Sequence, residues 1–217
     1  MSRLKSGMTF ACAMLIGSMV VNAKNISESG QAEKVFSAFF HAMGKPYRTG
    51  LPDEALQKKL SPYFSKGLAK LLLEAEHRQD ECLAIGAKIN RDILKHTKRG
   101  ETPAILKPAM IEGSIFAMQY ESPDGYKVIK SNIQDKNTLS LVVEYSYHDS
   151  TAASAYHWKS KVILINENDQ WRIDNFIEIP LEAGNTGKPD DVRSSLNNFP
   201  SCINDYKNYE KDNSYRH

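Results

Sequence analysis

The residues that could carry acid–base or metal chemistry are thinly spread along this chain of 217 residues. No two of its histidines have the i, i+4 spacing of a helical zinc site, and the motif H-E-x-x-H does not occur. No G-x-S-x-G nucleophile turn, P-loop or G-x-G-x-x-G motif occurs either. We therefore predict no catalytic residue, no metal site and no cofactor. The six histidines are His41, His77, His96, His148, His157 and His217.

Two of these histidines, His148 and His157, are expected on neighbouring strands, where they could approach each other. We interpret them as two solvent-exposed histidines on strands and not as a metal site, because no further ligand is apparent.

Three carboxylates, on Glu144, Asp174 and Glu178, fall in predicted strands. A carboxylate buried in an apolar pocket would have a raised pKa and could transfer protons. However, Glu144 and Asp174 alternate against the apolar residues of their strands, which predicts that both side chains face away from the core. Proton transfer inside a pocket therefore remains the weaker hypothesis.

Aromatic residues are concentrated in the same strand pair. Core packing is the default role of such residues, but amphipathic aromatic side chains on a sheet surface also form binding hot spots. The small polar loop 149–154 beside them suits a contact site better than a catalytic one. We therefore name these residues as a possible partner-binding group: Tyr145, Tyr147, Tyr156, His157 and Trp158.

The N-terminus has the pattern of an export signal. Two basic residues precede the uncharged apolar run 8–21, and Val21-Asn22-Ala23 fits the small-x-small rule for cleavage between Ala23 and Lys24. The run is too short for a comfortable membrane span, although an uncleaved N-terminal anchor is the alternative. The sequence thus predicts a periplasmic protein with no integral membrane segment after cleavage.

Cleavage would leave two cysteines, Cys82 and Cys202. Because an exported protein enters an oxidising compartment, we expect a disulfide between them, with two free thiols as the alternative.

Charge and length limit the class of partner. Arg3 and Lys5 account for the formal net charge of +2, so the chain after residue 23 is formally neutral. A neutral chain offers no electrostatic attraction for nucleic acid or for an anionic membrane surface. The remaining length suits one domain. We expect a signal peptide at 1–23, a flexible N-terminus at 24–30, a single domain at 31–198 and a polar tail at 199–217.

Helical patterns dominate the first half of the chain. Phe36, Phe39, Phe40 and Met43 form one apolar stripe at i, i+3, i+4 and i+7. A weaker helix is expected within 47–61, and one or two helices over 63–90. A short helix is expected at 190–198, after a flexible connection at 184–189.

Strand patterns follow. Apolar residues take every second position over 139–147, and the same alternation marks Trp158, Val162 and Leu164 and then Trp171, Ile173 and Ile177. Earlier strands are expected at 114–121 and 126–133. Helices followed by antiparallel strands predict an α+β fold, with N-terminal helices packed on a curved antiparallel sheet.

Three segments carry a family resemblance: LSPYFSKGLAKLLLEA at 60–75, GSIFAMQYESPDGYKV at 113–128 and the closing DQWRIDNFIE. With the order of elements, they resemble a family of bacterial exported domains of unknown function that has a nuclear-transport-factor-two-like (cystatin-like) cone fold. The resemblance covers most of residues 31–197 and supplies no catalytic signature.

The resemblance implies two functional hypotheses. Some exported members look like immunity proteins, which implies a non-catalytic periplasmic binding protein whose partner is a toxin or an envelope protein. The alternative is a small-molecule carrier or enzyme that uses an open cone pocket, since fold alone does not decide function.

Overall fold

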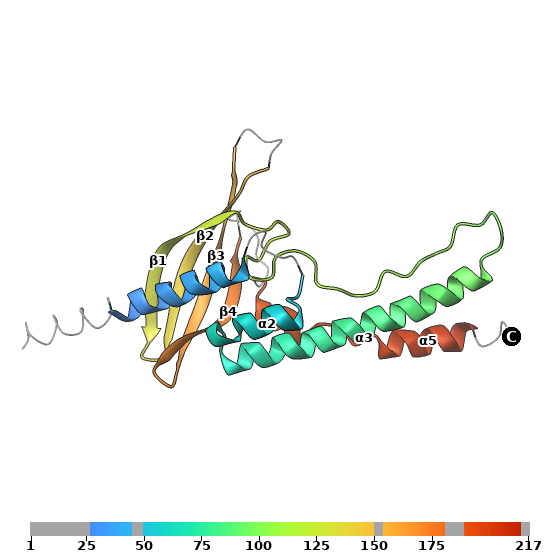
Figure 1. The fold of residues 1–217 in the computed structure, drawn as a ribbon, viewed down its shortest axis with the longest axis horizontal. Helices are drawn as coiled ribbons and strands as arrows, with labels where there is room; N and C mark the ends of the chain where they lie inside the picture. The colour runs from blue at the N-terminus through green and yellow to red at the C-terminus, as the bar shows by residue number, and fades with distance from the viewer. Residues whose placement is uncertain (1–26, 45–49, 150–153, 181–188, 214–217) are drawn as a thin grey trace, which may run out of the picture.

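The computed structural model describes residues 27–44, 50–149, 154–180 and 189–213. It has the predicted α+β order, in which helices precede a curved four-stranded antiparallel sheet (Figure 1). The predicted signal peptide, with Ala23 and Lys24, lies outside the described residues, as do most of loop 149–154 and of the connection at 184–189. The labelled helices are α2 (Glu54–Leu60), η1 (Ser61–Tyr63), α3 (Lys66–His96), α4 (Val192–Asn197) and α5 (Ile203–Asn213).

An N-terminal helix at 27–43 covers one face of the sheet, as its apolar stripe predicts (Figure 1). Phe36 and Phe39 of this helix are fully buried, and Phe40 is nearly so. Side chains at these spacings lie on the same helix face, so one side of the helix is apolar and packs against the sheet.

Capping residues set where the next helices begin. Asp53 accepts a hydrogen bond from the Leu56 amide at 2.9 Å at the start of α2, and Ser65 accepts one from the Leu68 amide at 3.0 Å at the start of α3. The stretch 63–90 thus holds one long helix rather than two, and this helix continues to His96.

The sheet is a simple meander with the strand order β1-β2-β3-β4. Inward-facing residues of β2 and β3 follow the predicted alternation, with Leu139, Leu141, Val162 and Leu164 fully buried. The outer edge of β4 is covered, because the Ser65 amide donates to Ile173 O at 2.8 Å and the Glu178 amide donates to Asp190 O at 2.9 Å. The strands are β1 (Gly125–Asp135), β2 (Thr138–Tyr147), β3 (Tyr156–Glu167) and β4 (Gln170–Ile179).

A β-bulge changes the inward-facing residues of β4. Ile163 pairs with Asn175 while Leu164 pairs with Ile173, so Asp174 is an extra residue in β4. Downstream of the bulge the alternation is reversed, and Phe176 is buried where the sequence had predicted Ile177.

The predicted strand at 114–121 is wrong. These residues form turns closed by one isolated bridge between Ser114 and Gln119, and Met118 has a positive φ of 57°. Phe116 and the adjacent Ala117 are both buried, which a half-buried strand cannot achieve because neighbouring side chains alternate between its faces. We call residues 111–121 the core loop.

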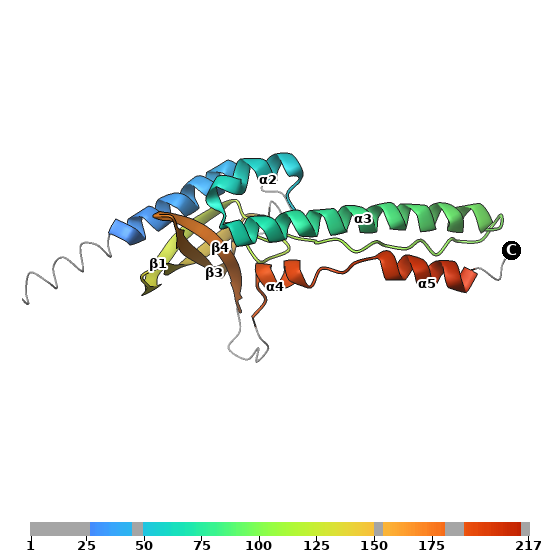
Figure 2. The same ribbon diagram turned by 90° about the horizontal axis from the view of Figure 1, so that it is seen from below.

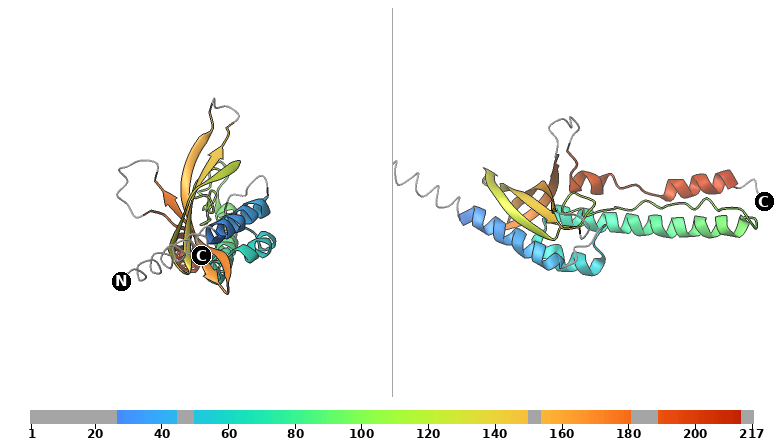
Figure 3. Two further views of the ribbon diagram at one scale, coloured as in Figure 1. Left: turned by 90° about the vertical axis from the view of Figure 1, so that its left-hand side faces the viewer. Right: turned by 90° about the horizontal axis from the view of Figure 1, so that it is seen from above.

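A stalk projects from the sheet domain (Figures 1 and 2). It consists of the second half of α3, the extended segment 97–112 and α5, which run beside one another in Figures 1 and 2 and in the right view of Figure 3. The expected polar tail at 199–217 therefore contains a helix, α5.

Candidate partner-binding site at the hairpin end of the sheet

The space between the N-terminal helix and the sheet is filled. Phe39 packs against Phe64, Phe116 and Phe176 with ring centroids 5.4–5.7 Å apart, and Phe40 lies 4.3 Å from Tyr126. In the described residues, aromatic side chains thus occupy the position that an open cone pocket would need.

Two of the three strand carboxylates in the proton-transfer hypothesis, Glu144 and Asp174, are engaged in contacts outside any pocket. Glu144 lies 3.6 Å from Lys159 Nζ, on the face of the sheet away from the core. Asp174 Oδ1 accepts hydrogen bonds from Ser65 Oγ and Arg193 Nη1, both at 2.6 Å. These contacts join β4 to the starts of α3 and α4, which is a structural role.

One end of the sheet gathers the remaining candidate residues. In an antiparallel meander, the start of β1, the end of β2, the start of β3 and the end of β4 lie at the same end. We call this the hairpin end, because the β2–β3 hairpin projects from it, at the top of Figure 1. The core loop meets the sheet here.

Two of the predicted partner-binding residues, Tyr145 and Trp158, are core residues. They are 1% and 2% exposed, and their rings stack with centroids 5.5 Å apart. Trp158 Nε1 donates to Ala117 O at 2.7 Å, and Tyr145 Oη donates to Phe116 O at 3.2 Å. A partner cannot reach either ring, so the prediction is corrected: these residues hold the core loop in place.

The other three predicted residues stand at the surface of the hairpin end. Tyr156 is 44% exposed and stacks on Trp158 at 5.6 Å, and His157 beside it is exposed. Tyr147, the register partner of Tyr156, is half-buried. The carboxylate of Glu121, followed by partial desolvation and by Asp149 and Asp124, raises the pKa of Tyr147. Three carboxylates therefore lie close to Tyr147 at this surface.

Of the two strand histidines, His148 is held by Asp124. The ring of His148 lies 3.0 Å from Asp124 Oδ2, and the His148 amide donates to the same oxygen at 2.5 Å. No cluster of three or more His, Cys, Asp or Glu side chains suited to a metal ion occurs among the described residues.

A pocket of about 330 Å³ opens next to this surface, between the core loop, the end of β4 and α4. Ile115, Met118, Val192 and Leu196 supply apolar walls. Its polar lining includes the carboxylates of Glu178 and Asp190, and the 68% exposed Tyr120 stands at its edge. No local sequence pattern predicts this pocket, because backbone pairing in the fold brings together residues that are far apart in the chain.

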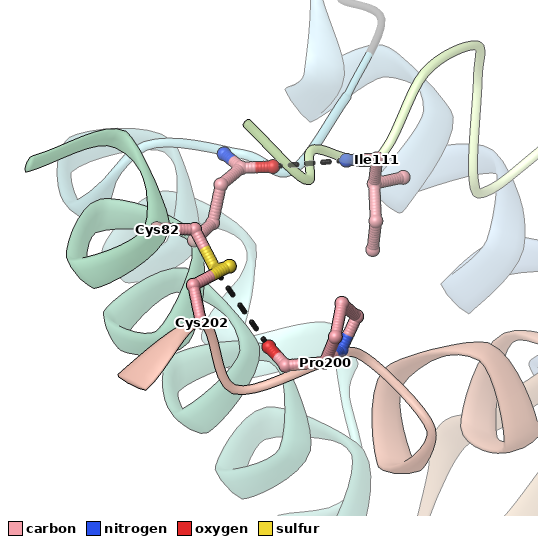
Figure 4. Close-up of a disulfide and its surroundings, with 5 residues drawn as sticks. Cys82, Ile111, Pro200 and Cys202 are labelled. Carbon is pink, nitrogen blue, oxygen red and sulfur yellow. Dashed lines mark hydrogen bonds between the residues drawn. A yellow bond between two sulfur atoms is a disulfide. The ribbon is translucent and has the colours of Figure 1, made fainter. Parts of the chain in front are cut away.

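A disulfide joins the stalk to the chain that follows α4, and it confirms the predicted pair (Figure 4). The Cα atoms of Cys82 and Cys202 lie 5.1 Å apart, within the normal range for a bridge. Both cysteines are buried with Phe199 in a small second core. The Gln79 side chain accepts a hydrogen bond from the Ile111 amide at 3.0 Å, which anchors the core loop beside the bridge.

Comparison with known proteins identifies no relative. No family model, no curated protein and no solved structure matches this chain. Among the described residues, no helix has the length and apolar character needed to cross a membrane.

Proposed function

We propose that this chain is an exported periplasmic binding protein without catalytic activity, and that it neutralises a secreted antibacterial toxin in the manner of an immunity protein. The proposal includes cleavage after Ala23 and a cystatin-like cone as the fold. The partner would bind at the hairpin end.

The observation that carries the proposal is where the aromatic side chains lie. Tyr145 and Trp158 are buried in the core, while Tyr147 is half-buried and Tyr156 and Tyr120 are exposed at the hairpin end. Tyrosine supplies a large contact area with few rotatable bonds, which is why it is enriched in binding hot spots.

The charge of the hairpin end supports a basic partner surface. Glu121, Asp124 and Asp149 act together on Tyr147. Opposite charge on a partner would speed encounter and orient docking.

A protection assay tests the proposal. The full chain would be coexpressed in a bacterial host with each toxin-like gene of its own genomic neighbourhood, with the toxin directed to the periplasm. We expect one toxin to be neutralised by the exported chain and not by a chain that lacks residues 2–23. Loss of protection in Tyr156→Ala, but not in Tyr63→Ala in η1, would place the contact at the hairpin end. The proposal would be contradicted if no toxin were neutralised, or if host cells survived equally well with the wild-type chain, the chain lacking residues 2–23 and both tyrosine variants.

A further inference from the structure

The pocket at the hairpin end has a volume and a lining that suit a side chain with an apolar stem and a polar end. Apolar walls come from Ile115 and Met118 of the core loop and from Val192 and Leu196 of α4. Its volume of about 330 Å³ exceeds that of any single amino-acid side chain. The apolar walls favour the aliphatic stem of an entering group.

The pocket walls are held in position before any partner arrives. Trp158 and Tyr145 bind the carbonyls of the core loop, and Gln79 binds its first amide at 3.0 Å. On the other side, the Glu178 amide donates to Asp190 O at 2.9 Å. A preformed pocket costs less ordering entropy on binding than a flexible one.

Two acidic residues of the pocket lining, Glu178 and Asp190, have no side-chain partner among the residues that the structure describes. The backbone bond between Glu178 and Asp190 places them next to each other, and neither side chain has a hydrogen bond or an ion pair within the described part of the chain. Other carboxylates of this region are engaged: Glu112 is 2.5 Å from Lys107 Nζ, and Asp191 Oδ1 accepts the Ser194 amide at 2.9 Å.

The charge of the lining decides what the pocket can accept. None of the residues that line it is a lysine or an arginine. An anion would be repelled, and an apolar group would desolvate two carboxylates without compensation. A cation on an aliphatic stem can pack against the apolar walls and can pair with the negatively charged side chains of the lining.

We propose that this pocket receives an arginine side chain of the protein partner. This inference rests on the proposed function and specifies its contact. The guanidinium forms paired hydrogen bonds with carboxylates, and it can stack on the exposed ring of Tyr120. Lysine has no planar fork for paired hydrogen bonds and no flat face for stacking, so it should bind more weakly.

The test uses N-acetyl-arginine-methylamide as the probe, titrated into the full mature chain and followed by NMR. Its control is the citrulline analogue, which has the same shape but no charge. We expect chemical shift changes confined to the pocket, and an affinity for the arginine probe about tenfold higher than for the citrulline probe.

Glu178→Gln and Asp190→Asn should each reduce that difference in affinity. Glu74→Gln, which changes an exposed carboxylate on α3, should not reduce it. Equal binding of the two probes, no binding at millimolar concentration, or shifts outside the pocket would overturn the inference.

Failure of this inference is distinguishable from failure of the proposed function. If Glu178→Gln and Asp190→Asn chains still protect against the toxin as well as the wild type does, the arginine contact is wrong and the function stands. If the wild-type chain protects against no toxin, the function fails whatever the probe does. Circular dichroism and the mass of the oxidised protein check that each variant folds.

Discussion

Trp158 and Tyr145 hold the core loop through buried hydrogen bonds to its carbonyls. Ser160 Oγ donates to Tyr145 Oη at 3.2 Å, so this phenol is both donor and acceptor. A buried carbonyl that loses its donor costs more than the bond itself contributes, since water cannot replace the donor.

Trp158→Phe should therefore destabilise the protein by about 2–4 kcal/mol, from the unpaired Ala117 carbonyl and the cavity left by the smaller ring. Urea unfolding followed by circular dichroism measures this loss. Tyr156→Phe, on the exposed neighbour, is the matched control and should change stability by less than about 0.5 kcal/mol. Equal stability of the two variants would show that the core loop is not held in this way.

The pKa of Tyr145 predicts how stability depends on alkaline pH. Burial raises this pKa far above its ordinary value, and the hydrogen bond from Ser160 opposes the rise only in part. Above about pH 10 the unfolded chain loses this proton while the folded chain keeps it, so stability falls as pH rises. The contribution of Tyr145 is about 1.4 kcal/mol per pH unit in that range.

Tyr145→Phe should therefore make the alkaline loss of stability less steep, although the variant is less stable at neutral pH. Urea unfolding at a series of pH values measures the slope, with the same substitution at the exposed Tyr120 as control. Parallel slopes for the wild type and Tyr145→Phe would contradict the burial of this phenol.

At the scale of elements, α3 holds the extended segment along one face. Gln79, Gly86 and Asn90 lie seven and four residues apart, which places them on the same side of the helix. Asn90 Nδ2 donates to Leu106 O at 2.9 Å, and Asn90 Oδ1 accepts the Leu106 amide at 2.7 Å. Between these anchors Gly86 is buried against Pro108, so the segment lies directly on the helix backbone.

Gly86→Ala tests this contact. Alanine normally stabilises a helix by about 1 kcal/mol relative to glycine. Here the added Cβ would lie 2.9 Å from Pro108 Cβ, so we expect a net loss of about 1–2 kcal/mol. Pro108→Ala in the same chain should relieve the loss, and the double-mutant cycle measures the coupling. A stabilising Gly86→Ala would show that the segment does not pack on α3.

The disulfide fixes the start of α5 to α3. Besides the bridge, Tyr209 Oη donates to Asp92 Oδ2 at 2.7 Å near the far end of α5. Replacing both Cys82 and Cys202 by alanine should cost about 3–5 kcal/mol, because the bridge closes a loop with a sequence separation of 120. Hydrogen exchange should become fast in α5 and stay slow in β2 and β3. Unchanged exchange in α5 would mean that other contacts hold this helix.

Local patterns determined much of the fold in advance. The aromatic stripe of residues 36–43 and the alternation of β2 and β3 follow from one buried face each, so periodicity was sufficient to predict them. The core loop was misread because Phe116, Met118 and Tyr120 alternate by chance within turns. Asp174 reverses the alternation of β4, and a bulge has no reliable local signal. Helix α5 was not predicted because its sequence is mostly polar. The disulfide at Cys202 holds its start against α3.

The candidate site was less predictable than the fold. Alternation could place Tyr145 and Trp158 on one face of the strands, but it could not show that the core loop covers that face. The pocket depends on Glu178 and Asp190, which meet only because the chain returns along the edge of β4. Such long-range pairing is a property of topology and not of local composition.

At the scale of the whole molecule, the proposed periplasmic role requires that the protein is exported. Mass spectrometry of the protein expressed with its N-terminus should find a mature chain that begins at Lys24, with Cys82 and Cys202 oxidised. Ala23→Arg should block this cleavage, because the position before the cut requires a small residue. A full-length chain with reduced cysteines would contradict a periplasmic role.

The central claim is that a protein partner binds at the hairpin end, and hydrogen–deuterium exchange of the mature chain with and without the neutralised toxin tests it most directly. We predict slower exchange in the complex at 119–124, at the ends of β2 and β3 beside Tyr147 and Tyr156, and at 190–192. Exchange that slows only along α3 and α5, or nowhere in the chain, would contradict the claim.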